Sequence, residues 1–413
     1  MTAASNREFD IVLFGATGFT GRLVVEYLCS HPDVGDLRWA IAGRNRSKLE
    51  SLRGELGPAY AELPILVGDC LDRKSLEPIA ARTSVVCTTV GPYCTYGSNL
   101  VAACVEAGTD YCDLTGEAHW IRQMIDAHHD DAVEKKVRLV HCCGFDSIPS
   151  DLGTLLLQRQ AIEEYGAPCK EIRFLVWRAR GAVSGGTVAT MAISMEQASK
   201  DRHLRRLMSD PYALVPDGDG PDGQFQQGPR RDEFAHTWTG PFIMAVINEK
   251  VVRRSNALLD YEYGRDFSYS EGFRTGSGVR GAIRAATVSG GSGAFAAAMS
   301  LGPTRKLLRR FVLPAPGEGP DEQARSNGSF EVRLFGRGTD ADGKDFEVWA
   351  RVGADLDPGY GATAIMLGES ALCLAQDAID EGLTGGDITP ASAMGTALID
   401  RLRSRGITFE IED

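Results

Sequence analysis

A short apolar run followed by three evenly spaced glycines constrains the fold of this chain more than any other feature. The run Ile11–Phe14 has the length of a buried parallel strand. Gly15, Gly18 and Gly21 follow it, and a helical pattern of apolar residues begins at once. In such a unit the first glycine permits a tight turn, the second lets backbone N–H groups approach a pyrophosphate, and the third lets the helix pack on the sheet. The segment predicts a dinucleotide site.

The end of the second predicted strand indicates which dinucleotide is bound. Leu37–Ala42 runs into Arg44, at a place where an NAD enzyme would carry an acidic residue for the ribose hydroxyls. A guanidinium suits a 2′-phosphate, so we expect NADP. The alternative is that Arg44 and Arg46 only decorate the start of the next helix.

Further βα units supply the remaining predicted cofactor contacts. Asp69 ends the third strand and either holds the adenine amino group or caps a turn. The fourth strand, Ser84–Thr88, runs into a Gly-Pro loop expected beside the nicotinamide, because ligands bind at the carboxyl ends of parallel strands. The predicted cofactor-binding residues are Gly15, Ala16, Thr17, Gly18, Phe19, Thr20, Gly21, Arg44, Asp69, Thr89, Val90, Gly91 and Pro92.

Three residues are candidates for catalysis. Tyr93 follows the loop expected at the nicotinamide, although a buried tyrosine is more often a core residue. Asp146 and Ser147 follow the sixth predicted strand and are expected to line a crevice. The alternative for Ser147 is a helix N-cap, since Pro149 suits the first turn of a helix.

Composition narrows the class of protein. The formal charge of −12 argues against nucleic-acid binding, which normally needs a basic face. The ten cysteines are scattered and several lie in apolar runs, as expected for reduced thiols in a cytoplasmic protein. The sequence contains no CxxC pair and no HExxH element, so we expect no metal site.

The pattern changes near Cys169. Glu171–Arg178 alternates apolar and charged residues, as a strand with one solvated face does. Further strands are predicted at Ile243–Arg253, Phe267–Phe273, Ser329–Phe335 and Phe346–Val352. They predict an α+β domain with an open mixed or antiparallel sheet, whose uncovered face is expected to line a cleft or a subunit interface. A homodimer is one option.

A segment rich in small residues, Gly278–Leu313, ends in a cluster of cations that includes Arg305 and Arg310. A basic helix at Thr304–Val312 would suit an anionic membrane surface or an acidic carrier protein. The alternative is a solvated helix on a connecting segment.

The ordered motifs of the chain resemble a known family. GATGFTG, TTVGPY, GTDYCDLTGE and CGFDSIPSD are followed by VSGGTVAT, VVRRSNAL, GYGATAIMLGESALCLA and TPASAMG, so that the resemblance spans nearly the whole chain. Together they are similar to the saccharopine dehydrogenase-like oxidoreductases, and within them to the trans-acting enoyl reductases that work beside polyketide synthases in making phthiocerol-type lipids.

The resemblance implies an α/β fold in three parts: a Rossmann domain at 1–155, an α+β domain at 156–355, and C-terminal helices at 356–413 that return to the first. It also implies NADPH-dependent reduction of an enoyl C=C bond in a fatty acyl or polyketide intermediate, delivered on a carrier protein or synthase. Two alternatives are a saccharopine reductase-like enzyme acting on an imine, and a non-catalytic NADP-binding protein associated with lipid or synthase. We expect a cytoplasmic protein, with peripheral membrane contact as an option.

Overall fold

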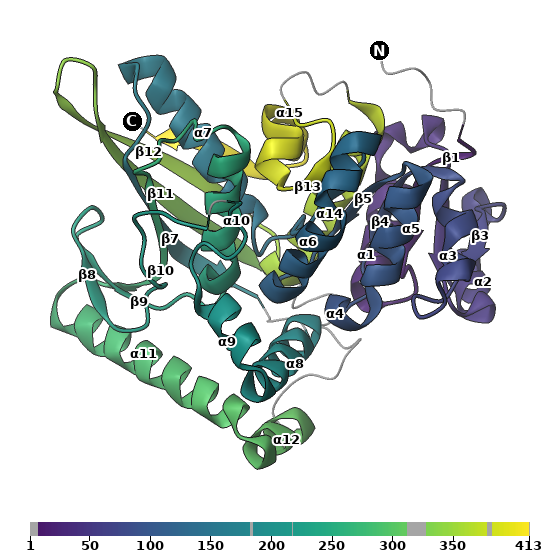
Figure 1. The fold of residues 1–413 in the computed structure, drawn as a ribbon, viewed down its shortest axis with the longest axis horizontal. Coiled ribbons are helices and arrows are strands. Elements are labelled where there is room, and N and C mark those ends of the chain that lie inside the picture. The colour runs from purple at the N-terminus through teal and green to yellow at the C-terminus, as the bar shows by residue number, and fades with distance from the viewer. Residues whose placement is uncertain (1–6, 182–184, 217, 312–327, 378–381, 413) are drawn as a thin grey trace. The chain divides into compact units, whose positions relative to one another are not determined.

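Two seven-stranded sheets organise the chain, for which a computed structural model describes residues 7–181, 185–216, 218–311, 328–377 and 382–412 (Figure 1). Each sheet belongs to one of two units. The first unit runs to Phe145 and includes Gly359–Arg405. The second takes most of the chain from Asp146 to Pro358, and also the C-terminal residues from Gly406 onward. Neither unit is therefore continuous in sequence.

The first sheet is wholly parallel, with the strand order β13-β6-β5-β4-β1-β2-β3. This is the Rossmann order, extended at one edge by a strand from the C-terminal part of the chain. It confirms the predicted class. The strands are β1 (Phe9–Phe14), β2 (Trp39–Gly43), β3 (Ile65–Val67), β4 (Thr83–Thr88), β5 (Asp110–Asp113), β6 (Arg138–Val140) and β13 (Gly386–Ile388).

Helices connect these strands, and local chemistry sets their ends. The side chain of Asn45 caps one helix by accepting the Lys48 amide, and Gly108 ends another in the left-handed conformation that glycine adopts freely. The helices are α1 (Phe19–Ser30), α2 (Arg46–Glu55), α3 (Arg73–Ala80), α4 (Tyr93–Tyr96), α5 (Ser98–Ala107), α6 (Ala118–Lys135), α14 (Thr363–Gln376) and α15 (Pro390–Ser404). Helix α14 is almost wholly buried, because it lies against α1 and the strands β1, β4 and β5.

The second sheet is mixed, as predicted, and has the order β14-β12-β11-β7-β10-β9-β8. Among the described strands of this sheet, β10 and β7 pair in parallel and the other neighbours are antiparallel. A turn at Asp340–Gly343 joins β11 and β12 into the predicted hairpin. The strands are β7 (Glu171–Arg180), β8 (Arg230–Asp232), β9 (Thr237–Gly240), β10 (Ser268–Gly276), β11 (Ser329–Thr339), β12 (Asp345–Ala354) and β14 (Thr408–Glu412).

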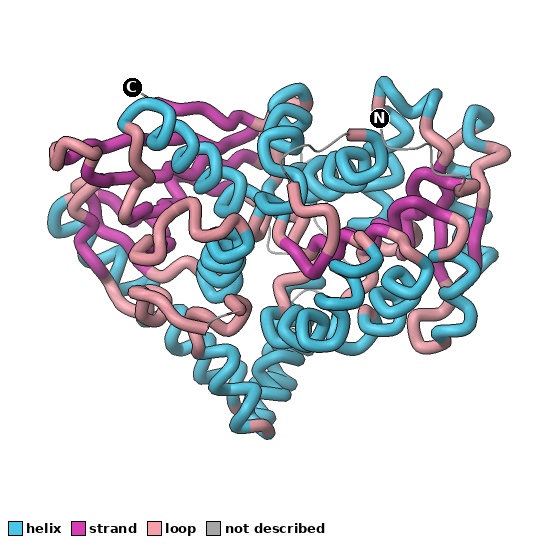
Figure 2. The backbone as a smooth tube through the Cα atoms, turned by 45° about the horizontal axis from the view of Figure 1, so that its top comes forward, coloured by secondary structure: helices cyan, strands magenta, loops and turns pink. Residues whose placement is uncertain are grey.

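Six helices of this unit are described: α7 (Ile148–Tyr165), α8 (Gly185–Lys200), α9 (Arg202–Ser209), α10 (Ala245–Leu258), α11 (Gly278–Ser300) and α12 (Gly302–Phe311). Helix α7 packs on β11 and β12, α10 packs on α7 and β10, and α11 packs on β9 and β10. Figure 2 shows the strands in magenta and the helices in cyan.

The strand predicted at Ile243–Arg253 is wrong, because this segment forms most of α10. Its apolar residues suggested a strand, but the polar residues between them find buried partners that a helix brings within reach. Asn248 donates to Glu271 at 3.0 Å, and Arg253 donates to Asp222 at 2.8 Å. Paired charges of this kind can be buried at a tolerable free-energy cost, so the helix is buried nearly all round.

A buried ion cluster joins the ends of three strands in the first unit. His141, directly after β6, lies 2.7 Å from Asp113 of β5 through Nδ1 and 3.2 Å from Asp387 of β13 through Nε2. Burial lowers the pKa of His141, but the two carboxylates outweigh burial and raise that pKa to about 10. His141 is therefore an imidazolium at neutral pH.

Replacing this cation should destabilise the first unit. In His141→Leu two buried carboxylates lose their counter-ion, and we expect the free energy of unfolding at pH 7 to fall by about 3–5 kcal/mol in urea titrations. Since the folded-state pKa is raised, the contribution of His141 is fully present below the ordinary histidine value and is lost as pH rises through about 10. The difference between variant and wild type should shrink in that direction.

The control is His203→Leu on α9, where the histidine is exposed and the change should stay within about 0.5 kcal/mol. Equal losses for the two variants would show that the cluster contributes no special stability.

Candidate functional site

The glycine turn after β1 is built by close backbone contacts. Gly15 has φ +91° and donates to the Ala42 carbonyl at 2.9 Å, and the Gly18 amide donates to the Gly15 carbonyl at 3.0 Å. A Cβ at Gly15 would lie 2.6 Å from Val90 Cγ2, and one at Gly21 would lie 2.2 Å from the Gly15 carbonyl oxygen. Both positions must therefore be glycine for the helix to meet the turn.

Gly18 differs from its two neighbours in the motif. It is exposed, its φ is an ordinary −75°, and a Cβ there would meet only the Gly15 oxygen, at 3.3 Å. This contact is tight, but it is far less severe than the contacts that a Cβ would make at Gly15 and Gly21. Gly18 is the N-cap of α1 and has no side chain to cover the positive end of the helix, so the turn fits a pyrophosphate.

The other predicted residues of this turn divide by exposure. Thr17 is exposed and Thr20 half-buried, whereas Ala16 is fully buried and contributes to the core. Phe19 packs edge-on against Tyr360, with ring centroids 4.7 Å apart. Their contact with cofactor stays a prediction.

Arg44 is exposed, and no side-chain hydrogen bond or ion pair joins it to another described residue. Arg46, by contrast, forms an ion pair with Glu50 at 3.8 Å on α2. The decorating role considered for both arginines therefore suits Arg46, and the guanidinium of Arg44 is available to a phosphate. One carboxylate oxygen of Asp69 accepts a hydrogen bond from the Leu71 amide at 2.9 Å and so stabilises the turn after β3, as in the capping alternative.

The loop after β4 lies against the glycine turn, since β1 and β4 are neighbours where the strand order reverses. Thr89 Oγ1 donates to the Gly15 carbonyl at 3.3 Å, and the Val90 amide donates to Thr88 Oγ1 at 3.3 Å. The Gly91–Pro92 peptide that follows is cis. The two predicted halves of the cofactor site are thus brought together within one unit.

Glu117 holds this loop and was missed by the sequence analysis. Its buried carboxylate accepts the amides of Tyr93 at 2.7 Å and Cys94 at 2.9 Å, which are the first two of α4. An acidic side chain at a helix N-terminus is favourable. The sequence signal was the Thr-Gly-Glu after β5, which only a known strand order connects to α4.

Tyr93 lies in the core. Its hydroxyl donates to the Thr88 carbonyl at 3.1 Å, and the ring packs against Trp120 with centroids 5.4 Å apart. Burial, with the nearby charge of Asp113, raises the pKa of Tyr93 well above its ordinary value. These contacts favour the alternative in which Tyr93 is a structural residue.

Ser147 stands at the N-cap of α7, but its side chain does not cap the helix. The hydroxyl donates instead to Asn248 Oδ1 at 2.9 Å, in the buried polar network of α10. Its φ of −125° and ψ of −25° also depart from the extended conformation that capping needs. The cap interpretation of Ser147 is therefore wrong for its side chain.

Asp146, the first residue of the second unit, has different surroundings from Ser147. It is half-buried, and no hydrogen bond or ion pair joins its carboxylate to another described residue. Removal from water raises the pKa of Asp146 to about 6. A carboxyl group in this state can hold or release a proton near neutral pH.

One group of metal-ligand type occurs among the described residues. Cys94, Glu117 and His119 bring one potential ligand atom each within 4.8 Å of one another. Both oxygens of Glu117 already accept amide hydrogens, so we assign this carboxylate to α4. Whether the protein holds a metal stays untested.

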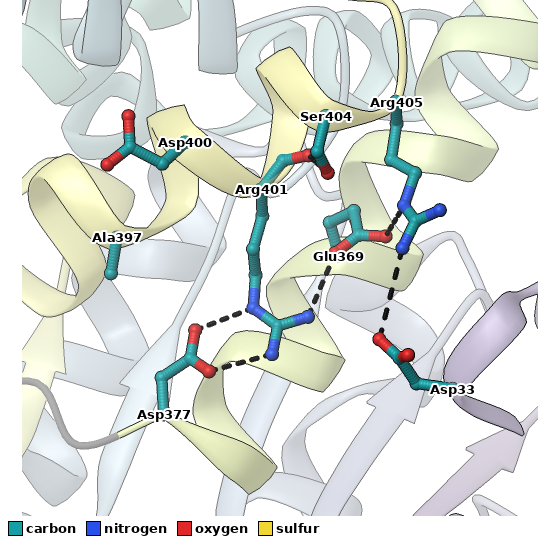
Figure 3. A pocket seen from close by; sticks show the side chains of 8 residues that line it. All are labelled: Asp33, Glu369, Asp377, Ala397, Asp400, Arg401, Ser404 and Arg405. Atoms are coloured by element: carbon teal, nitrogen blue, oxygen red, sulfur yellow. Dashed lines mark hydrogen bonds and ion pairs between the residues drawn. The ribbon is translucent and has the colours of Figure 1, made fainter.

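A polar pocket of about 400 Å³ lies near the C-terminal end of α1, where Asp33 of the following turn lines it (Figure 3). Arg401 donates to Glu369 at 3.1 Å and to Asp377 at 2.7 Å. Arg405 lies 3.3 Å from Glu369 and 4.0 Å from Asp33. These ion pairs connect α15 with α14 and with the turn after α1, so the pocket is a structural junction remote from the glycine turn.

The structure corrects part of the prediction made for the cationic segment at Thr304–Val312. Arg305 is buried, donates to the Met299 carbonyl at 3.0 Å and lies 3.6 Å from Glu196. It therefore holds α12 in place and is not part of an exposed basic face. The side chains of Lys306, Arg309 and Arg310 lie outside the described residues. In the described part of the chain, no helix is both long and apolar enough to cross a membrane.

Comparison with known proteins agrees with this geometry. The saccharopine dehydrogenase NADP-binding domain matches residues 11–140. Trans-acting enoyl reductases of Mycobacterium tuberculosis and Mycobacterium ulcerans are 41% and 40% identical, each over 98% of both chains. The saccharopine dehydrogenase of Saccharomyces cerevisiae has a similar fold, with a TM-score of 0.52 and 13% identity over 98% of this chain and 99% of that one.

The matched domain covers β1 to β6, and therefore includes the glycine turn, Arg44 and the loop after β4. The protein is an NADP-dependent oxidoreductase. Because the identity extends over almost the whole chain, it belongs to the trans-acting enoyl reductase branch of the saccharopine dehydrogenase-like oxidoreductases.

Proposed function

We propose that the protein reduces the C=C bond of an enoyl intermediate, a fatty acyl or polyketide thioester, in lipid biosynthesis. The observation that carries this proposal is the 41% identity, over 98% of both chains, to proteins named trans-acting enoyl reductases. We further propose that the substrate arrives on a carrier protein or synthase, and that the reaction takes place in the cytoplasm.

The chain's own residues support the proposal as follows. NADPH, when bound, supplies the hydride. The glycine turn and the N-terminus of α1 would hold its pyrophosphate, and Arg44 its 2′-phosphate. The loop Thr89–Pro92, fixed by Glu117, would bound the nicotinamide end. Asp146 is our candidate proton donor, because its carboxyl group has no fixed partner among the described residues and its pKa is raised.

Two alternatives make different demands. A saccharopine reductase-like enzyme must pair the carboxylates of its amino-acid substrate with cationic side chains. Without such partners, burying these carboxylates in an apolar pocket would be costly in free energy. A protein in which the dinucleotide is only structural would bind NADPH without consuming it.

Substrate assays separate these functions. With NADPH and a long-chain 2-enoyl thioester we expect NADPH consumption and an acyl product two hydrogens heavier by mass spectrometry. A carrier-bound thioester should be the better substrate, and saccharopine with NADP should not be turned over. Turnover of saccharopine without enoyl reduction would contradict the proposal, and tight NADPH binding with no turnover of either would favour the structural role.

The glycines of the turn should separate binding from folding. Gly18→Ala should lower the melting temperature only slightly, because its Cβ would meet just the Gly15 carbonyl oxygen, at 3.3 Å, yet it should lose most of the thermal shift given by NADPH. Gly21→Ala should instead lower the melting temperature of the free protein, since its Cβ would collide with a backbone oxygen. Gly35→Ala, which meets nothing within 4 Å, should change neither. Native NADPH affinity in Gly18→Ala would place the pyrophosphate elsewhere.

Arg44 should determine cofactor choice. Arg44→Ala removes a charge-assisted contact and should weaken NADPH binding by roughly 1.5–3 kcal/mol, with little effect on NADH. Arg46→Ala is the matched control, because that guanidinium already has Glu50 as partner. Calorimetric titration of both cofactors measures the effect. Equal losses of NADPH and NADH affinity in Arg44→Ala would show that Arg44 does not contact the 2′-phosphate.

We expect the Asp146 carboxyl group to raise the rate of catalysis and to lower the free energy of unfolding. If its carboxyl group donates the proton, wild-type kcat should fall as pH rises through about 6, and Asp146→Asn should lose most activity and that pH dependence.

The same raised pKa also affects folding, because the protonated carboxyl group contributes stability below its unfolded value that is lost as pH rises through about 6. Asp146→Asn should therefore unfold with about 1–3 kcal/mol more free energy than wild type at pH 8, and with a smaller difference at pH 5. The exposed Asp36→Asn should change neither property. An active Asp146→Asn enzyme would remove Asp146 from catalysis.

A further inference from the structure

Helix α9 concentrates positive charge in an acidic chain. Its residues, Arg202–Ser209, include three arginines and a histidine but no acidic residue, whereas the whole chain has a formal charge of −12. Arg202, Arg205 and Arg206 are exposed. In the part of the chain that the structure describes, none of their three guanidinium groups forms a hydrogen bond or an ion pair with another residue.

The three arginines lie on one side of α9, which we name the α9 face. Residues three and four apart are neighbours on a helix, so Arg202 lies beside both Arg205 and Arg206. The apolar residues of the helix have the same spacing, are half-buried and lie on the opposite side: Leu204, Leu207 and Met208. Helix α9 packs on α8, next to it in Figure 1. The apolar side therefore faces the protein, and the α9 face is turned to solvent.

The α9 face is unfavourable for the helix itself. Like charges one turn apart repel each other, and Arg202 places a cation at the N-terminus, where the helix dipole is positive. Other helices place an acidic residue one turn from a cation: Arg22–Glu26, Arg46–Glu50, Arg73–Glu77, Arg122–Asp126 and Glu196–Lys200. The carboxylates of Asp201 and Asp210, which flank α9, accept backbone amides instead of guanidinium donors. A charge pattern that lowers stability without compensation in the described chain indicates an anionic partner outside it.

We propose that the α9 face docks an acidic helix of the carrier protein that delivers the acyl substrate. The naming of the carrier rests on the proposed function. A guanidinium pairs bidentately with a carboxylate, and Arg202 and Arg206 are about 6 Å apart along the axis, from a rise of about 1.5 Å per residue. Carboxylates one turn apart on another helix have the same separation, so two facing helices can pair their charges. Because the chain as a whole repels an acidic partner, docking requires a locally cationic surface.

Two other anionic partners fit this surface less well. A helix that lies on a membrane inserts an exposed apolar side, whereas the apolar residues of α9 are half-buried on its own protein. A nucleic acid needs a broader basic surface than one short helix offers, and the net charge of −12 opposes its approach. Arg305, the cation predicted for carrier binding, is buried and lies 3.6 Å from Glu196.

Binding of a carrier without an acyl chain tests docking separately from catalysis. An acidic acyl carrier protein in its apo form, labelled with a fluorophore, is titrated with the full chain and followed by fluorescence anisotropy. At about 20 mM salt we expect a dissociation constant in the micromolar range, and at about 500 mM salt binding about tenfold weaker, because salt screens exposed charges. Absence of carrier binding at low salt overturns the proposal, whether or not the protein reduces enoyl thioesters. Binding to phosphatidylglycerol vesicles in place of the carrier would assign the α9 face to a membrane and also overturn it.

A matched pair of charge reversals tests the position of the docking surface. Arg202→Glu should weaken carrier binding at low salt about tenfold, since it repels an acidic helix and gives Arg206 a partner within α9. Arg280→Glu makes the same change in the first turn of α11, where the exposed Arg284 lies one turn further on, and should weaken binding less than about threefold. Equal losses of carrier binding in the two variants overturn the assignment to α9.

The melting temperatures of the same variants test the argument from helix stability. A glutamate suits the first turn of a helix and pairs with an arginine one turn later, so Arg202→Glu should melt at or slightly above the wild-type temperature. Arg280→Glu should behave in the same way. A lower melting temperature in Arg202→Glu would show that this arginine supports the fold, and would overturn the proposal.

Turnover locates the effect at the carrier. With an enoyl group on the carrier, Arg202→Glu should raise KM about tenfold at nearly constant kcat. With the same group on N-acetylcysteamine, it should leave both constants unchanged. Equal effects on the two substrates overturn the docking proposal. Failure of the wild type to reduce either thioester would contradict the proposed function instead, and the binding experiment would still decide the docking.

Discussion

The contact between α1 and the turn after β1 is the constraint on which the cofactor-binding unit depends. The backbone of Gly21 lies so close to the Gly15 carbonyl that a single methyl group would not fit. This closeness aims the first-turn amides of α1 at the space beyond the strand end, and lets Thr89 of the neighbouring loop donate to the same carbonyl. The glycine turn, the N-terminal part of α1 and the loop after β4 thus all meet at the Gly15 carbonyl oxygen.

Much of this unit could be predicted from sequence, because its βα units are local and each carries its own signal. An apolar run of four to six residues, a glycine or a capping side chain, and a helical period are enough to place β1 to β6 and the helices between them. The residues at the strand ends then follow from topology, as Arg44 and Thr89 did. The parallel order was predictable because most strands that follow one another in sequence are also neighbours in this sheet.

Features that depend on distant partners could not be predicted. Arg253 looked like a charged residue of a strand, but its hydrogen bond to Asp222, thirty-one residues earlier, lets it be buried in a helix. Ser147 looked like a helix cap, yet its hydroxyl donates a hydrogen bond to Asn248, about a hundred residues later in the chain. The role of Glu117 likewise depends on strand order. In each case a long-range polar pairing overrides a local preference, and a single sequence carries no signal for such a pairing.

The edge strand β13 has a consequence for synthesis of the protein on the ribosome. Strand β6 ends at Val140, but its partner β13 begins only at Gly386, and α14 lies between them in sequence. The nascent chain therefore exposes one flank of the first sheet, and the surface that α14 will cover, while more than two hundred residues of the other unit are made. Unpaired strand edges and bare apolar surfaces are prone to aggregation, so this order of synthesis creates an interval in which the nascent chain is open to mispairing with other chains.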